Sequence, residues 1–141
     1  MIGAFAKTDV VKAFPTNSIR HVARLMAEKK VGLVVLVDPK EHDRIVGVIS
    51  ERDVVKAVAF DVDLDSPCDV VATKNVITVE YDQPVAKAAE IFRKYNIRHV
   101  VVTKNGRLFG VLSIRDLIRD EDALREVAEF YEWTFEPGMS A

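Results

Sequence analysis

The chain repeats itself, and this repetition limits the folds that its 141 residues can adopt. The segment Gly47–Val55, with the sequence GVISERDVV, returns 63 residues later as GVLSIRDLI at Gly110–Ile118. Upstream, residues 19–37 align with residues 85–103 at an offset of 66, and we place the three-residue difference in a turn, where insertions are tolerated. Because a solenoid needs about three repeats or more, two copies predict a pair of similar units that share one core.

Each copy predicts the same order of elements. Apolar residues at helical spacing predict one helix per copy, formed by Ile19, Val22, Ala23 and Met26 in the first copy and by Val85, Ala88, Ala89 and Phe92 in the second. The unbroken β-branched run 31–37 predicts a strand covered on both faces, and residues 45–50 and 108–113 predict strands that lead into helices. The predicted fold class is α+β, with two pseudo-twofold-related repeats that are each a small three-stranded sheet with helices on one side.

The two helices have different predicted starts, and a further helix follows the repeats. Thr16, Asn17 and Ser18 are N-cap candidates for the first helix, and Asp82 is the candidate for the second, with Pro84 in its first turn. We predict the first repeat at residues 1–66, the second at 67–120 and a helical tail at 121–141. The tail carries Leu124, Val127, Ala128 and Tyr131 at helical spacing and an aromatic cluster of Phe130, Tyr131, Trp133 and Phe135. We expect this cluster to pack on the body or on a second copy, the alternative being a docking stripe for an effector protein.

Composition excludes several classes of function. The net charge of −2 gives no basic footprint for nucleic acid, and no apolar run is long enough to span a membrane. The N-terminal residues lack the basic start and long apolar core of a signal peptide. A single cysteine, Cys68, excludes an internal disulfide and favours a reducing compartment. We therefore expect a cytoplasmic protein.

The predicted helix 51–60 indicates a second copy of the chain. It carries Val54, Val55 and Val58 with few polar positions between them, and a helix that is apolar nearly all round is covered on more than one side. We expect a homodimer through this helix, while burial within the same chain remains the alternative.

A duplicated Ser-x-Arg-Asp motif stands where each predicted strand enters its helix, at residues 50–53 and 113–116. Ser followed three residues later by an acid is typical of a capping box, which alone explains the Ser and Asp. In the functional interpretation, the helix N-terminal amides, the hydroxyl and the Arg bind an anion while the carboxylate accepts hydrogen bonds from a sugar diol. Capping does not require the Arg, which both copies contain.

The duplicated motif, with segments such as YNIRHVVV at residues 95–102, resembles CBS domains, two of which in tandem form a Bateman module. The resemblance covers about residues 8–120. It implies binding of an adenosine nucleotide, with AMP favoured and ADP or ATP as alternatives, in a cleft between the repeats. It also implies that the Asp binds ribose hydroxyls, that the Ser and neighbouring basic groups bind phosphate, and that adenine lies between apolar strand residues.

Carried over residue by residue, the resemblance implies two ligand sites. Site A would consist of Ser50, Arg52, Asp53, Thr78, Ile97, Arg98 and His99. Site B would consist of Lys12, Val31, Leu33, Ser113, Arg115 and Asp116. Site A is the more polar, because the first-repeat counterparts of Thr78 and His99 are Lys12 and Leu33. Arg98 can face either site, and His99 has the alternative of an ordinary strand histidine.

Motifs for other chemistry are missing from the sequence. His21, His42, His99 and Cys68 lack metal-ligand spacing, and neither glycine-rich phosphate loops nor a nucleophile elbow occur. We expect no enzyme and no metal, and we expect Cys68 to be a loop or surface thiol. The main hypothesis is a regulatory or energy-sensing module that can also act on an unidentified regulated protein. The alternative is a structural or protein-interaction dimer module without a nucleotide.

Overall fold

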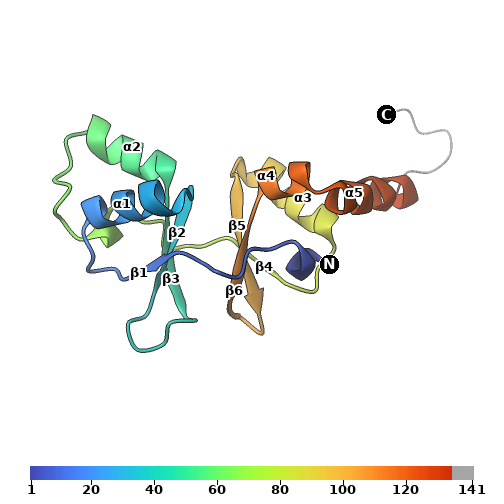
Figure 1. Ribbon diagram of the computed structural model, residues 1–141, viewed down its shortest axis with the longest axis horizontal. Helices are drawn as coiled ribbons and strands as arrows, with labels where there is room; N and C mark the ends of the chain where they lie inside the picture. The colour runs from blue at the N-terminus through green and yellow to red at the C-terminus, as the bar shows by residue number, and fades with distance from the viewer. Residues whose placement is uncertain (135–141) are drawn as a thin grey trace. The chain divides into compact units, whose positions relative to one another are not determined.

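The computed structural model describes the backbone of residues 1–134, which forms two compact units (Figure 1). Residues 9–77 make up the first-repeat unit. Residues 1–8, together with the chain from Thr78 onward, make up the second-repeat unit. No helix within the described part of the chain has the length and apolar character needed to cross a membrane.

The first-repeat unit is a three-stranded sheet with its helices on one side (Figure 1). Its strands lie in the order β1-β2-β3, with β1 parallel and β3 antiparallel to the central β2. Its elements are β1 (Lys12–Ala13), α1 (Ile19–Lys29), β2 (Leu33–Val37), β3 (Ile45–Ser50), α2 (Glu51–Ala59) and the 3-10 helix η2 (Cys68–Val70).

The second-repeat unit has the same arrangement, with strand order β4-β5-β6 and the same parallel and antiparallel pairings. Its elements are the 3-10 helix η1 (Ile2–Ala4), β4 (Thr78–Glu80), α3 (Val85–Tyr95), β5 (His99–Lys104), β6 (Arg107–Ser113), α4 (Ile114–Arg119) and α5 (Glu121–Thr134). The α+β class, the two three-stranded sheets and the C-terminal helix predicted from the sequence are confirmed.

The helix starts confirm one predicted cap and correct another. The Ser18 hydroxyl accepts a hydrogen bond from the backbone N–H of His21 at 3.0 Å, as an N-cap side chain does. Asp82 is not the cap of α3. Pro84 holds that position and makes no side-chain capping bond, since the helix begins at Val85, three residues after Asp82.

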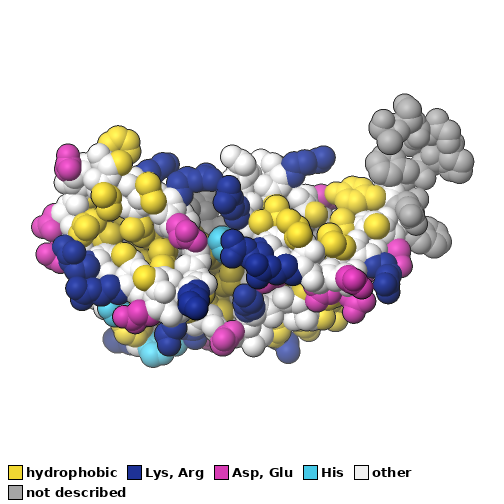
Figure 2. All heavy atoms as spheres, turned by 45° about the horizontal axis from the view of Figure 1, so that its top comes forward, with side chains coloured by type: hydrophobic (Ala, Val, Ile, Leu, Met, Phe, Trp, Pro, Cys, Tyr) yellow, Lys and Arg dark blue, Asp and Glu magenta, His cyan; other side chains and the backbone are white. Residues whose placement is uncertain are grey.

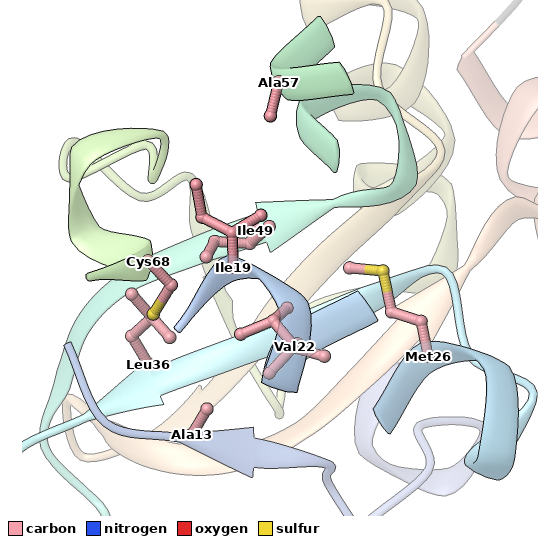
Figure 3. Close-up of a cluster of buried hydrophobic side chains, with 9 residues drawn as sticks. Ala13, Ile19, Val22, Met26, Leu36, Ile49, Ala57 and Cys68 are labelled. Carbon is pink, nitrogen blue, oxygen red and sulfur yellow. The ribbon is translucent and has the colours of Figure 1, made fainter. Parts of the chain in front are cut away.

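The core of the first-repeat unit lies between its sheet and its helices (Figure 3). One face of α1 meets the inward side chains of β2 and β3, and the apolar residues are nearly inaccessible to water. The residues labelled in the figure are Ala13, Ile19, Val22, Met26, Leu36, Ile49, Ala57 and Cys68. Burial of such side chains stabilises the fold by about 25 cal/mol for each Å² of apolar surface. The apolar stripe predicted for α1 is the face of the helix that this core buries.

Cys68 belongs to this core, and the expectation of a loop or surface thiol is wrong. It is fully buried at the start of η2, and its Sγ donates to the carbonyl oxygen of Phe14 at 3.3 Å. Burial raises the pKa of the Cys68 thiol to about 11, with a further contribution from the carboxylate of Asp69. Cys68 is therefore a structural residue that joins η2 to the segment after β1.

Residues 1–8, which we call the N-terminal arm, pack on the second-repeat unit. Ile2 is fully buried, and the N–H of Gly3 donates to the carbonyl oxygen of Tyr81 at 2.8 Å. Lys7 then forms an antiparallel bridge with Val111 of β6. The N-terminal arm therefore packs beside the second sheet, although the predicted first repeat at residues 1–66 contains it in sequence.

The tail helix α5 carries part of the predicted aromatic cluster. The rings of Phe130 and Tyr131 meet edge to face with their centroids 5.8 Å apart, and both residues are half-buried. Phe130 lines an open groove of the second-repeat unit together with Met1, Pro84 and Val85. The side chain of Trp133 and all of Phe135 lie outside the described residues.

Candidate functional site

Strand register brings predicted site residues to one end of each sheet. In the first-repeat unit, Leu33 at the start of β2 lies opposite Ser50 at the end of β3. In the second-repeat unit, His99 at the start of β5 lies opposite Ser113 at the end of β6. The same end carries the motif helix in each unit, so that polar groups and helix N-terminal amides meet there.

Ser50 and Asp53 form a complete capping box at the start of α2. The backbone N–H of Ser50 donates to Asp53 Oδ2 at 2.8 Å, and the Ser50 hydroxyl donates to the same oxygen at 3.0 Å. The Asp53 N–H lies 3.4 Å from Ser50 Oγ. The predicted capping interpretation is confirmed, and among the described residues Oδ1 of Asp53 has no hydrogen bond.

Ser113 and Asp116 repeat the box at the start of α4. The Ser113 N–H donates to Asp116 Oδ2 at 2.9 Å, and the Asp116 N–H donates to Ser113 Oγ at 3.0 Å. The side chain of Asp116 is only 17% exposed. Both carboxylates are therefore fixed in direction before any ligand arrives.

A backbone hydrogen bond ties each motif helix to the first strand of its hairpin. The N–H of Glu51 donates to the carbonyl oxygen of Gly32 at 3.0 Å. The N–H of Ile114 donates to the carbonyl oxygen of Arg98 at 2.8 Å. The residues on either side of these two carbonyl groups, including Val31 and Ile97, are half-buried.

The cationic side chains of the predicted sites are exposed and can move. They are Lys12 at the start of β1, Arg52 in α2, Arg98 before β5 and Arg115 in α4. Thr78, the counterpart of Lys12, begins β4 and pairs with Val101. Exposed lysine and arginine side chains suit an anionic ligand, because they can turn toward it and form charge-assisted hydrogen bonds.

Each predicted site takes residues from both units, whereas the contacts just described lie within one unit. The second-repeat unit brings His99 and Arg98 of site A close in register to Ser113 of site B. The first-repeat unit does the same for Leu33 of site B and Ser50 of site A. We call each such group a half-site, and the combination of half-sites into sites A and B stays a prediction.

Lys7 is a candidate residue that the sequence interpretation missed. Its Nζ lies 3.4 Å from Asp116 Oδ1, the oxygen that the capping box leaves over. The repeat aligns Lys7 with Thr73 at the offset of 66 residues, but this alignment alone predicts no contact with Asp116. A cation at this oxygen competes with other hydrogen-bond donors for the same carboxylate.

The arrangement can hold a ligand with a diol and an anionic group. A carboxylate oxygen accepts sugar hydroxyls, while the amides at a helix N-terminus and nearby arginines stabilise an anion. Within residues 1–131, no three His, Cys, Asp or Glu side chains are grouped so that they could hold a metal ion.

Comparison with known proteins identifies the family. A model of the CBS domain matches residues 2–60 and 68–123. The structure resembles that of the CBS domain protein PAE2072 from Pyrobaculum aerophilum complexed with AMP, with a TM-score of 0.85 and 45% identity over 91% of this chain and 98% of that one. It also resembles the CBS domain pair of protein MJ0100 in complex with 5-methylthioadenosine and S-adenosyl-L-methionine (TM-score 0.77, 28% identity, 84% of this chain and 93% of that one).

A curated relative matches over most of its length as well. An uncharacterized 17.7 kDa protein of Acidianus ambivalens is 40% identical over 119 residues, which are 84% of this chain and 71% of that protein. The two matched segments contain both capping boxes and both hairpins. The chain belongs to the CBS domain family and carries two copies of the domain.

Proposed function

We propose that the chain is a regulatory module that binds an adenosine nucleotide, AMP in the first place and ADP or ATP as alternatives, at its two half-sites. The observation that carries this proposal is the pair of preformed carboxylates, Asp53 and Asp116, each held by a capping box beside a hairpin end. The solved relative PAE2072, at 45% identity, is described in complex with AMP.

Each part of the half-site has a role in this proposal. In each aspartate, Oδ2 is bonded within the capping box. Oδ1 of Asp53 accepts hydrogen bonds from the ribose hydroxyls, and Oδ1 of Asp116 does the same in the second half-site. The arginines next to the boxes, Arg52 and Arg115, turn toward the phosphate. The adenine ring packs against the half-buried side chain of Ile97 or of Val31.

The same half-sites also suit other adenosyl compounds. The ribose and adenine are common to AMP, 5-methylthioadenosine and S-adenosyl-L-methionine, and the last two are the ligands named for the MJ0100 pair. What separates them is the charge at the 5′ position, so the exposed cations decide the preference. The four cationic side chains of the predicted sites favour a phosphate there.

We further propose a homodimer through α2. Val55 and Val58 of this helix are 65% and 59% exposed, and hydrophobic side chains lie open over the helices of each unit in Figure 2. Covering these valines with a second copy removes apolar surface from water. Binding of nucleotide would then act by changing how the two copies pair, with a regulated protein downstream and no catalysis by this chain. A buried reduced thiol at Cys68 suits the cytoplasm.

An interaction module without nucleotide is the second candidate, and a specific observation favours it. Both capping boxes are complete with protein groups alone, so Ser50, Asp53, Ser113 and Asp116 have a structural role without any ligand. A cap typically contributes about 1 kcal/mol, which is enough to account for these residues.

Calorimetry on matched variants separates the two candidates. In the nucleotide-binding protein, Asp53→Ala and Asp116→Ala weaken AMP binding, because each removes a ribose acceptor. Ser18→Ala is the control: it removes the N-cap of α1, and hence a similar amount of stability, at a helix outside the half-sites. It should leave the AMP dissociation constant unchanged.

A thermal-shift panel of AMP, ADP, ATP and S-adenosyl-L-methionine tests the proposal first. A ligand at about 100 times its dissociation constant stabilises the native state by about 2.7 kcal/mol, which raises the melting temperature by several degrees. If none of the four compounds raises it at millimolar concentration, the interaction module is the better account. Binding that survives both aspartate substitutions would place the ligand elsewhere.

A further inference from the structure

Lys7 and Thr73 occupy equivalent positions in the two units. Lys7 exchanges two backbone hydrogen bonds with Val111, each 2.9 Å long. Thr73 exchanges two with Val48, at 2.9 and 3.0 Å. Val48 and Val111 are themselves equivalent residues of the duplicated segment, so the same backbone bridge carries a cation in one unit and a hydroxyl in the other.

The cation of Lys7 lies on the ligand-facing carboxylate of its own unit. Its Nζ is 3.4 Å from Asp116 Oδ1, while Oδ2 accepts from the backbone N–H of Ser113. The Lys7 side chain is 70% exposed, so its stem can change conformation freely. In the first-repeat unit, Lys74, the residue after Thr73, forms its ion pair with Asp69 instead of Asp53.

We propose that Lys7 is a specificity-determining residue that makes the half-site of Ser113 and Asp116 prefer a phosphorylated nucleoside to an uncharged one. This inference rests on the proposed function, because it assumes that Asp116 accepts ribose hydroxyls. An uncharged nucleoside must displace the Lys7 ammonium group from Oδ1 of Asp116, and it carries no anion to which that group can bind instead. A nucleoside monophosphate carries, on the same ribose, an anion to which the displaced ammonium group can move.

The size of the effect follows from the exposure of the pair. An exposed ion pair contributes at most about 1 kcal/mol, which corresponds to about fivefold in affinity. Loss of the Lys7 ammonium group should therefore strengthen adenosine binding by up to about fivefold. It should weaken AMP binding by a similar factor, because the phosphate loses a charged donor. The first half-site has an uncharged Thr73 at this position and gains no preference from it.

The test compares AMP with adenosine by calorimetry on the full chain. Asp53→Ala removes the ribose acceptor of the first half-site, so the remaining binding reports on Asp116. In this background, Lys7→Met should reduce the preference for AMP over adenosine, by up to about 25-fold if each of the two affinities changes by its full factor of about five. Lys7→Arg, which keeps the charge, should retain the preference. Both substitutions leave the backbone bridge to Val111 available, and a melting curve checks the fold.

A matched gain of charge tests the same idea in the other unit. In the background of Asp116→Ala, Thr73→Lys should increase the preference for AMP over adenosine. An unchanged ratio in both Lys7→Met and Thr73→Lys would overturn the role of Lys7 while leaving the proposed function in place. Absence of binding by Asp53→Ala, when the unmodified chain binds AMP, would overturn it as well. If the unmodified chain binds neither compound, the proposed function fails and takes this inference with it.

Discussion

Gly110 lies against the backbone of Lys7, so closely that a Cβ on Gly110 would be 2.7 Å from the Lys7 carbonyl oxygen. Its counterpart Gly47 lies against Thr73 with more room, since a Cβ there would be 3.3 Å from the carbonyl oxygen. In both units a glycine in the last strand allows another segment to bridge to the residue after it. The contact in the second-repeat unit is the tighter of the two.

Gly110→Ala should destabilise the fold by about 1–3 kcal/mol, because the new methyl group meets rigid backbone rather than a flexible side chain. Gly47→Ala is the matched control, and there a shift of a few tenths of an ångström accommodates the methyl group. Urea unfolding of the two variants measures the difference. Equal losses of stability would mean that the backbone at Lys7 moves away from the new methyl group as easily as the backbone at Thr73 does.

The two ribose acceptors should contribute unequally to nucleotide binding. Removing a partner from a buried polar group costs about 1–3 kcal/mol, so Asp53→Ala should weaken AMP binding about ten- to a hundredfold. Asp116→Ala should cost less, because Lys7 already occupies Oδ1 of Asp116, whereas Asp53 has no such ion pair among the described residues. Calorimetry on the two single variants gives both values. Equal losses would contradict the inequality without affecting the proposed ligand class.

Cys68 should resist modification in the native protein. Its thiol pKa is raised from 9.0 to about 11, so its thiolate fraction at pH 8 is about a hundred times smaller than in the unfolded chain. Reaction with a disulfide reagent should be slow in buffer and fast in denaturant. Because the folded state holds the proton more tightly, this contribution to stability is fully present below pH 9.0 and is lost as the pH rises toward about 11. Rapid labelling of the native protein at pH 8 would contradict the burial of Cys68.

Val58→Asp should convert the proposed dimer to a monomer or to insoluble protein, because it places an unpaired charge in the contact. Light scattering should report about twice the chain mass for the unmodified protein and the single chain mass for a soluble variant. Val70→Asp is the control, since Val70 is exposed to a similar degree but lies in η2 rather than in α2. A monomeric unmodified protein would remove the role of α2 in pairing.

Much of the fold could be predicted because it depends on local patterns. The stripe that begins at Ile19, the cap at Ser18 and the boxes at Ser50 and Ser113 are each encoded within about four residues of sequence. The duplication then placed the same elements twice, and it identified the polar ends of both hairpins as candidate sites.

The contacts that could not be predicted join residues far apart in the chain. No sequence pattern near Lys7 predicts its bridge to Val111, because a bridge formed by a single residue produces no hydrophobic periodicity. The burial of Cys68 likewise depends on its contact with Phe14, 54 residues away. The residue type of Asp82 predicts a helix cap, but the backbone becomes helical only after Pro84.

The bridge between Lys7 and Val111 also orders events during synthesis of the protein. Residues 1–8 are synthesised before residues 9–77, yet their partners Tyr81 and Val111 are synthesised after residues 9–77. Residues 9–77 can fold into their own unit before the partners of the N-terminal arm have been synthesised, since domains generally fold as they emerge from the ribosome. The arm makes contacts across most of the described chain, such as that of Met1 with Glu126, 125 residues away, and such non-local contacts form late. Ile2 therefore stays open to solvent, and to chaperones, until β6 has emerged.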